Sequence, residues 1–263
     1  MIDLTVPEIR QKLQQADEAQ FAVLERSLVA DTRKGVRSAV EVARRRLQAE
    51  REEAERLRGM YDFQAALAAE HGGSVVVGLD EVGRGPLAGP LAVGAVVLPE
   101  EPLIAGLNDS KQVRPEDREI IAEQVRARAV AWTVQYVEPA AIDRQGMTAS
   151  LRQAFRAAIA AVEAQGVAVD VVLLDGNPLH LDEREVNVVK GDGKCASIAA
   201  ASLVAKVARD HLMEEYARQY PGYGFEGNKG YGSAEHMEAI RVRGLTPIHR
   251  RSFCTSFTQE SLF

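Results

Sequence analysis

Cysteine, histidine and tryptophan are scarce in this sequence, which has two, five and one of them among 263 residues. The two cysteines, Cys195 and Cys254, stand in no metal-ligand spacing, and this usage indicates a reduced, cytoplasmic compartment. Cys195 opens a predicted helix, a position that can activate a thiol. We interpret it instead as a buried, inert cysteine.

Long apolar runs and a strong excess of charge are also lacking. No N-terminal apolar segment precedes a cleavage site and no run is long enough to span a bilayer, so neither secretion nor membrane insertion is predicted. The net charge of −6 argues against coating of nucleic acid through overall charge, although it leaves a local basic surface open. Apolar residues make up 46% and charged residues 27%, as is typical of a soluble globular protein.

Residues 1–70 read as a small helical module. Thr5-Val-Pro-Glu8 is a capping box with proline in the first turn, and apolar residues at three-four spacing from Val36 predict one long amphipathic helix. The other face of this helix carries Arg44-Arg45-Arg46. It is either a solvated face or a basic strip that contacts a nucleic acid backbone, and we predict that these arginines add affinity for a duplex. Gly72-Gly73 marks a linker.

Residues 73–263 alternate between strand and helix patterns, which predicts a mixed α/β sheet flanked by helices, followed by a C-terminal helical segment. The expected strands are 74–79, 91–98, 131–137, 169–174 and 186–189, and the expected helices are 115–129, 148–165, 196–219 and 234–243.

Three of the expected strands finish in an acid, namely Asp80, Asp175 and Asp192. Carboxylates at the ends of neighbouring strands converge in the crevice where open α/β sheets bind ligands. Without a cation such a cluster repels itself, and oxygen ligands of this kind suit Mg²⁺ or Mn²⁺. Glu81 follows Asp80 directly and would point to the opposite face of a regular strand, so we expect the strand to bend there into the glycines that follow.

The glycines of GLDEVGRGPLAGP permit a rival interpretation, because Gly83-x-Gly85-x-x-x-Gly89 looks like a dinucleotide-binding loop. Pro86 and Pro90 stand where the helix of such a loop should begin, and the next segment reads as a strand. The context therefore disfavours a nucleotide cofactor.

The motifs DEVGRGPLAGP, LNDSKQ, LLDGN, VVKGD, SIAAASLVAKVARD, NKGYGS and HRRSF occur in series, and in this order the sequence resembles bacterial ribonuclease HII across residues 75–253. The resemblance implies a ribonuclease-H-like fold. It also implies metal-binding, catalytic acids at Asp80, Glu81 and Asp175, with a fourth at Asp192. Asp210 is a rival for the fourth position, but its place along a helix suits a surface role better.

The family resemblance further implies an endonuclease that uses two Mg²⁺ or Mn²⁺ ions. Its substrates would be RNA–DNA hybrids and duplex DNA with embedded ribonucleotides, which it would nick on the 5′ side to leave a 3′-hydroxyl and a 5′-phosphate. We expect a cytoplasmic monomer without a membrane partner, acting in ribonucleotide excision repair and DNA replication.

Substrate-binding residues also follow from the resemblance. Gly83, Arg84 and Gly85 would read the ribose 2′-hydroxyl through main-chain groups, and Tyr231 would stack on the adjacent deoxyribose. Candidates for phosphate contact are Lys111, Lys194 and Ser197. Lys206 and Arg209 are either phosphate contacts or ordinary surface cations, and His249-Arg250-Arg251 either touches the duplex backbone or is solvated.

A different class of function stays open beside the enzyme, a non-catalytic protein that binds hybrids with the same fold. The four acids argue against it, because a pure binder has no use for repelling carboxylates next to phosphates.

Overall fold

The computed structural model describes residues 4–255, and its contacts divide the chain into two compact units. The N-terminal unit is Met1–Arg58 and the C-terminal unit is Gly59–Phe263. The boundary between these contact units falls inside one helix, α3 (Lys34–Glu70), which ends just before the predicted glycine linker. The end of α3 packs on the C-terminal unit, where Ala68 joins a cluster of buried sheet residues.

The N-terminal unit consists of α1 (Val6–Gln15), α2 (Glu18–Leu28) and the first part of α3. Its first helix is capped as the sequence predicts, with the Thr5 amide donating to Glu8 Oε2 at 2.7 Å. The helices bury one apolar cluster made of Ile9, Leu13, Ala16, Phe21, Leu28, Val36, Ala39, Ala43 and Leu47.

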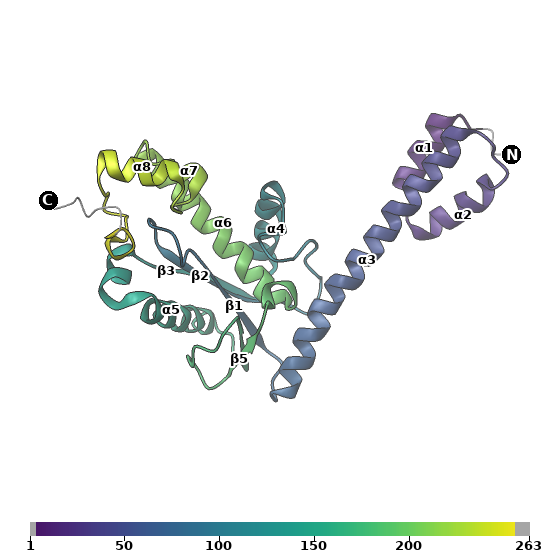
Figure 1. Cartoon of the computed structure of the whole chain (residues 1–263). Helices are drawn as coiled ribbons and strands as arrows, with labels where there is room; N and C mark the ends of the chain where they lie inside the picture. The colour runs from purple at the N-terminus through teal and green to yellow at the C-terminus, as the bar shows by residue number, and fades with distance from the viewer. Residues whose placement is uncertain (1–3, 256–263) are drawn as a thin grey trace. The chain divides into compact units, whose positions relative to one another are not determined.

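The C-terminal unit is built on a five-stranded sheet of order β3-β2-β1-β4-β5 (Figure 1). The strands are β1 (Val76–Val82), β2 (Leu91–Val97), β3 (Ala131–Val137), β4 (Val171–Asp175) and β5 (Glu185–Val188). The β1–β2 and β2–β3 pairs are antiparallel, whereas the β1–β4 and β4–β5 pairs are parallel. This is the mixed sheet that the sequence predicts.

Helices cover both faces of the sheet, with α5 (Pro139–Glu163) and α6 (Ala196–Gln219) on opposite sides (Figure 1). The helix α6 lies unusually close to the strands because two glycines face it. A Cβ atom on Gly78 would stand 2.2 Å from the Ser197 carbonyl carbon, and one on Gly94 would stand 2.2 Å from the Ala201 carbonyl oxygen. The small side chains of α6 therefore let it pack flat on the sheet, and α4 (Pro115–Arg128) packs against α6 in turn.

The C-terminal segment folds into α7 (Phe225–Asn228) and α8 (Ala234–Arg243), drawn in yellow-green and yellow in Figure 1. Together with the end of α6 it encloses a small core of its own around Phe225 and Met213. Two short 3₁₀ turns, η1 (Gly191–Gly193) and η2 (Arg251–Phe253), precede α6 and follow α8.

Two predicted boundaries differ most from the observed ones, while those of β2, α4, β4 and β5 shift by only one or two residues. The first helix turns of α5 begin at Pro139 rather than at residue 148, and the non-helical conformation of Gly146 marks a kink that separates them from the part predicted from sequence. The strand β1 continues to Val82 instead of ending at Leu79. Within residues 4–255, no helix combines the length and the apolar character needed to cross a bilayer.

Candidate active site

Asp80 and Asp175 come from the two central parallel strands. Asp80 is paired with Gly94 inside the β1–β2 ladder, and Asp175 is the last residue of β4. Along β1 and β4 the alternate residues Val77, Leu79, Val172 and Leu174 face the α5 core. Asp80 and Asp175 are one residue out of step with that set, so both belong to the face that α6 covers.

Asp80 is buried and is affected by the charges of two other acids. Burial raises the pKa of Asp80 well above its usual value, and the negative charges of Glu81 and Asp175 raise it further, while a hydrogen bond from Ser202 opposes the increase. A neutral carboxyl, or a carboxylate with a nearby cation, is the stable state of a group in this position.

Glu81 lies inside the regular strand, where it is paired with Val93. The bend expected at this residue is therefore absent, and the strand turns only after Val82. The charge of Asp175 nevertheless affects the pKa of Glu81. Burial raises the pKa of Glu81 and the charge of Asp175 adds to this, whereas an ion pair with Arg84 at 3.1 Å lowers it.

Asp192 lies in the 3₁₀ turn η1 and not at a strand end, because β5 already ends at Val188. The turn is tied to β4 by a hydrogen bond of 2.6 Å from the Gly191 amide to Asp175 Oδ1. Burial raises the pKa of Asp192, and repulsion from Asp175 contributes. All four predicted acids thus belong to one electrostatic cluster. The rival Asp210 instead forms a 2.6 Å ion pair with Lys206 on α6.

The donor set of this cluster fits a divalent ion such as Mg²⁺ or Mn²⁺. All four groups are carboxylates. Burial first, and repulsion from neighbouring acids second, raise the pKa of Asp80 and Asp192 and so disfavour their charged forms in the protein alone. As placed, however, no three histidine, cysteine, aspartate or glutamate side chains among residues 4–255 form a ready-made cage.

The glycine turn, defined as residues 83–90, joins β1 to β2 beside the acids. Gly83 has a φ of 89°, and a Cβ atom there would stand 2.3 Å from Arg209 Nε. Only glycine meets both conditions. Because the turn leads into a strand and not into a helix, it lacks the helix N-terminus that a dinucleotide loop needs.

Tyr231 lies directly beside this turn. A Cβ atom on Gly85 would be 3.9 Å from the Tyr231 ring, and the tyrosine is 46% exposed, as its glycine neighbours suggest. The preceding residue, Gly230, accepts hydrogen bonds from the amides of Leu87 and Ala88 at 2.8 and 3.2 Å. The turn and the tyrosine loop therefore form one continuous surface.

Two arginines expected at the surface or at the duplex backbone are fully buried. Arg209 donates to the carbonyls of Pro90, Ala88 and Lys229, and Arg250 donates to those of Gly83, Arg84 and Gly89, as the hydrogen bonds of 2.6–3.2 Å show. Neither interpretation made from the sequence is right for them. No local pattern could have revealed it, since the partner carbonyls of Arg250 are more than 150 residues away in the chain.

His249, the neighbour of Arg250, is also buried and is hydrogen-bonded to His236. Of the basic cluster, only Arg251 is exposed.

The predicted phosphate contacts have different surroundings. Lys111 is 81% exposed and lies 3.9 Å from Asp192 Oδ2, so it flanks the acids. Lys194 is exposed and donates to the Val189 carbonyl at 2.8 Å. Ser197 is fully buried, and both its amide and its hydroxyl bind Gln64 of α3, at 2.9 and 2.6 Å. Its predicted contact with phosphate would require Gln64 to move away, and it stays a prediction.

Cys195 is confirmed as an inert residue. It is fully buried, and burial raises the pKa of its thiol to about 12, which keeps it protonated at neutral pH.

Comparisons with known proteins decide between the interpretations. A family model described as Ribonuclease HII matches residues 77–256, and one described as Ribonuclease HII N-terminal domain matches residues 5–68. The chain belongs to the ribonuclease HII family. It is therefore a ribonuclease H endonuclease, which cleaves RNA in RNA–DNA hybrids, and the non-catalytic binder is not retained.

Individual relatives agree with the family. Ribonuclease HII of Listeria monocytogenes is 38% identical over 245 residues, which cover 93% of this chain and 92% of the relative. Ribonuclease HII of Enterococcus faecalis is 41% identical over 223 residues, covering 85% and 86%. The crystal structure of ribonuclease H2 from Pyrococcus horikoshii matches with a TM-score of 0.59 at 26% identity, covering 71% of this chain and 100% of that one.

The family match also extends to residues 5–68, which the motif series does not reach. In the N-terminal unit, the predicted basic strip is largely neutralised by glutamates. Arg44 pairs with Glu25 and Glu41, and Arg46 pairs with Glu50 at 2.8 Å. The strip is thus closer to a solvated ion-paired face than to a free cationic surface.

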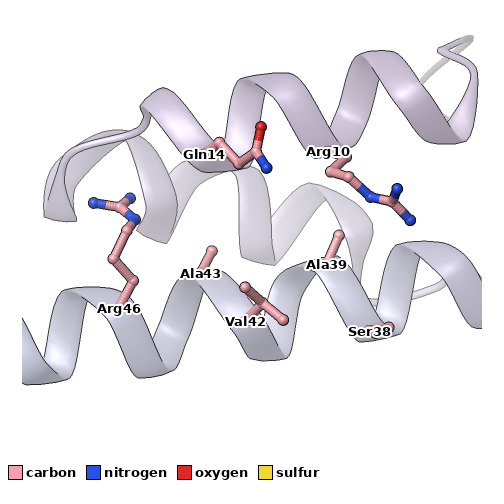
Figure 2. A pocket seen from close by; sticks show the side chains of 7 residues that line it. All are labelled: Arg10, Gln14, Ser38, Ala39, Val42, Ala43 and Arg46. Atoms are coloured by element: carbon pink, nitrogen blue, oxygen red, sulfur yellow. The ribbon is translucent and has the colours of Figure 1, made fainter.

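A groove of about 200 Å³ lies between α1 and α3 in this unit, with the Arg10 and Arg46 side chains at its two ends (Figure 2). Arg46 donates to the Ala16 carbonyl at 2.6 Å, so its main role there is to hold the end of α1.

Proposed function

We propose that this enzyme also nicks duplex DNA on the 5′ side of a single embedded ribonucleotide, leaving a 3′-hydroxyl and a 5′-phosphate. The observation that carries the proposal is the surface formed by Gly85 and Tyr231 next to the acids. The link between the two is short, because Arg84 of the turn contacts Glu81 of the acid cluster at 3.1 Å. A ribose bound at this surface would lie beside the carboxylates.

In this proposal Asp80, Glu81, Asp175 and Asp192 hold two Mg²⁺ or Mn²⁺ ions. The bound ions would activate a water and neutralise the charge that develops on the reacting phosphate. The contribution of the chain is to bring carboxylates from β1, β4 and the η1 turn to one place, with Asp80 and Asp192 buried, so that a cation is favoured there. Lys111, exposed beside Asp192, would bind a phosphate of the substrate.

Ribose recognition falls to the glycine turn and Tyr231. The exposed residues Arg84 and Gly85 can bring main chain close to a sugar because the second has no side chain. A 2′-hydroxyl offers an oxygen that a deoxyribose lacks, so an N–H group placed here distinguishes the two sugars. The ring of Tyr231 would then stack on the next sugar and test that it is a deoxyribose.

The test is a labelled duplex with one ribonucleotide, incubated with Mn²⁺ or Mg²⁺ beside an all-DNA duplex of the same sequence. We expect a single nick on the 5′ side of the ribonucleotide and none in the control, with a 3′ end that a polymerase extends directly. Equal cutting of both duplexes, or a nick on the 3′ side, would contradict the proposal.

The remaining parts of the proposal concern the cell. We propose a cytoplasmic monomer that acts in ribonucleotide excision repair and DNA replication, since a nick with a free 3′-hydroxyl is a substrate for resynthesis. Sedimentation of the full chain, with and without duplex, tests the monomer.

A further inference from the structure

The guanidinium of Arg250 occupies the inner side of the glycine turn. It is fully buried and donates to the carbonyl oxygens of Gly83 at 2.6 Å, Arg84 at 2.9 Å and Gly89 at 2.8 Å. Within residues 4–255 it forms no ion pair with a carboxylate. Burial, together with the nearby charge of Arg209, lowers the pKa of Arg250 to about 9. Burying a cation without a counterion costs folding free energy, and this cost indicates a functional role for Arg250.

The geometry of the peptide group shows what Arg250 does to the turn. In a trans peptide the C=O and the N–H point in opposite directions. The Gly83 carbonyl shares its peptide group with the Arg84 N–H, and the Arg84 carbonyl shares its group with the Gly85 N–H. With both carbonyls held inward by Arg250, the two N–H groups point outward.

The outward N–H groups are also available. Arg84 and Gly85 are exposed, and in the part of the chain from 4 to 255 their amides donate to no protein acceptor. Two adjacent free N–H groups next to the Tyr231 ring are suited to bind an oxygen of a sugar or phosphate. The turn therefore presents donors, and the carbonyls of Gly83 and Arg84 are not its outward-facing groups.

The neighbouring residue, His249, holds the tyrosine loop in a similar way. Its Nδ1 accepts from the Thr246 amide at 2.9 Å, so its proton is on Nε2, which lies 3.0 Å from His236 Nε2. His236 Nδ1 is 2.8 Å from the Tyr231 carbonyl, which can only accept. The hydrogen bonds thus run in one direction, from Thr246 through both neutral imidazoles to the backbone of Tyr231.

The backbone around these two residues completes the connection. The Gly89 amide donates to the Ile248 carbonyl at 2.9 Å, and the Arg250 amide donates to the Leu87 carbonyl at 2.8 Å. The residues His249 and Arg250 are therefore fixed against the far side of the glycine turn, while one side chain reaches the turn and the other reaches the tyrosine loop.

We infer that His249 and Arg250, here called the brace, are positioning residues that set the spacing between the outward N–H groups of the glycine turn and the Tyr231 ring, and thereby the preference for a ribose followed by a deoxyribose. This inference rests on the proposed function, because it assigns the residues that hold its ribose-reading surface. The brace touches no substrate itself.

The experiment compares Arg250→Lys with Arg251→Lys, the same chemical change at the exposed neighbouring residue. For each enzyme, KM and kcat are measured on the one-ribonucleotide duplex, and the all-DNA duplex is used as a competitor to obtain Ki. The ratio of Ki to KM reports ribose preference in a single preparation. Lysine lacks the planar guanidinium that holds the Gly83 and Arg84 carbonyls and so orients the N–H groups of Arg84 and Gly85. The ratio of Ki to KM should therefore fall about tenfold in Arg250→Lys. In Arg251→Lys it should stay at the wild-type value.

Thermal unfolding of each variant separates positioning from stability. If Arg250→Lys lowers Tm but keeps the wild-type ratio of Ki to KM, Arg250 has only a structural role and the inference is wrong. If the wild-type enzyme itself does not nick the one-ribonucleotide duplex, the proposed function fails instead, before any variant is compared.

A second variant, His249→Asn, tests the positioning role of the brace even if Arg250→Lys does not fold. His249→Asn keeps an acceptor near Thr246 but is too short to reach His236, so it releases the Tyr231 loop alone. We expect a KM about three- to tenfold higher, consistent with the loss of one buried hydrogen bond. In a cycle with Tyr231→Ala, the double variant should be no worse than Tyr231→Ala. Additive effects would show that His249 does not act through the tyrosine and would overturn the inference.

Discussion

In the N-terminal unit Arg44 and Arg45 of α3 lie at the surface in ion pairs with glutamates, whereas in the C-terminal unit Arg209 and Arg250 are buried and bind backbone carbonyls. Arg44, for example, has a side chain that is 50% exposed and contacts two carboxylates, while Arg209 is fully buried and contacts three carbonyls. The exposed pairs can exchange with water at little cost, but the buried guanidiniums cannot. Charge therefore solubilises the first unit and organises the second.

The acids extend the same contrast. In the N-terminal unit each of the paired carboxylates of Glu25, Glu41 and Glu50 has an arginine partner. In the C-terminal unit burial raises the pKa of Asp80, and the negative charge of Asp175, which repels that of Asp80, raises it further. Uncompensated buried charge is a common sign of a functional site, and here both signs of charge occur within one region of the fold.

The largest effect should follow from neutralising Asp80. Asp80→Asn should lower kcat on an RNA–DNA hybrid by a factor on the order of 10³, because a ligand of the proposed ions is lost. In the absence of divalent ions its Tm should not fall and should rather rise, since burial raises the pKa of Asp80 and the charged carboxylate destabilises the fold at neutral pH. Single-turnover cleavage and calorimetry measure the two quantities.

Asp210→Asn is the matched control for that change, because Asp210 is an ion-paired acid on α6. It should keep wild-type activity. Comparable losses of activity in both variants would remove the special role of Asp80.

The contrast between buried and exposed arginines predicts the next largest effect. Arg209→Met should destabilise the C-terminal unit by about 3–5 kcal/mol, because three buried carbonyls lose their donors. Arg44→Met should cost less than about 1 kcal/mol. Denaturant unfolding followed by the fluorescence of Trp132 reports the first change and far-UV circular dichroism reports the second. Similar losses of unfolding free energy in Arg209→Met and Arg44→Met would contradict the difference between buried and exposed arginines.

A smaller effect concerns pH. Burial lowers the pKa of His249 to about 4, with the neighbouring His236 contributing. The unfolded chain therefore takes up a proton first as pH falls from about 6.5, so stability is lost between about pH 6.5 and pH 4 and is fully present above this window. We expect a loss of about 1–2 kcal/mol at pH 5 relative to pH 7.

His249→Asn checks the origin of this loss. Melting curves of the variant should lack the His249 part of the pH dependence, so the difference in Tm between variant and wild type should narrow towards pH 4. A constant difference at all pH values would mean that His249 does not titrate in this way.

The smallest effect is expected from the arginine strip. Replacing Arg44, Arg45 and Arg46 by glutamine should change duplex affinity by less than about threefold and leave the salt dependence nearly unaltered, because these guanidiniums already have carboxylate partners. Binding titrations across salt concentrations measure both. A clearly smaller salt slope in the triple variant would restore the strip as a duplex contact.

Local patterns in the sequence were enough to predict much of this structure. The bounds of α6 and β3 are as expected, because a run of small apolar residues and an alternating strand are each recognisable alone. The acids Asp80 and Asp175 could be identified because they follow apolar strands beside glycines. Each of these predictions depends on a sequence pattern that lies within a few neighbouring residues.

The errors arose where distant residues decide the outcome. The strand β1 runs past Leu79 because β2 pairs with Asp80, Glu81 and Val82, and an acidic pair gives no sign of this. Ser197 looked accessible at a helix start, but Gln64 covers it from α3. The sequence places Arg250 either at the duplex backbone or in solvent, and only the folded chain brings it under the glycine turn.

The most direct test of the account is a crystal of the full chain soaked in Mn²⁺, with anomalous diffraction recorded at the manganese edge. We predict manganese peaks among the carboxylates of Asp80, Glu81, Asp175 and Asp192, next to the free N–H groups of the glycine turn. Peaks found only elsewhere, with Asp80 and Asp175 bound to no ion, would contradict it.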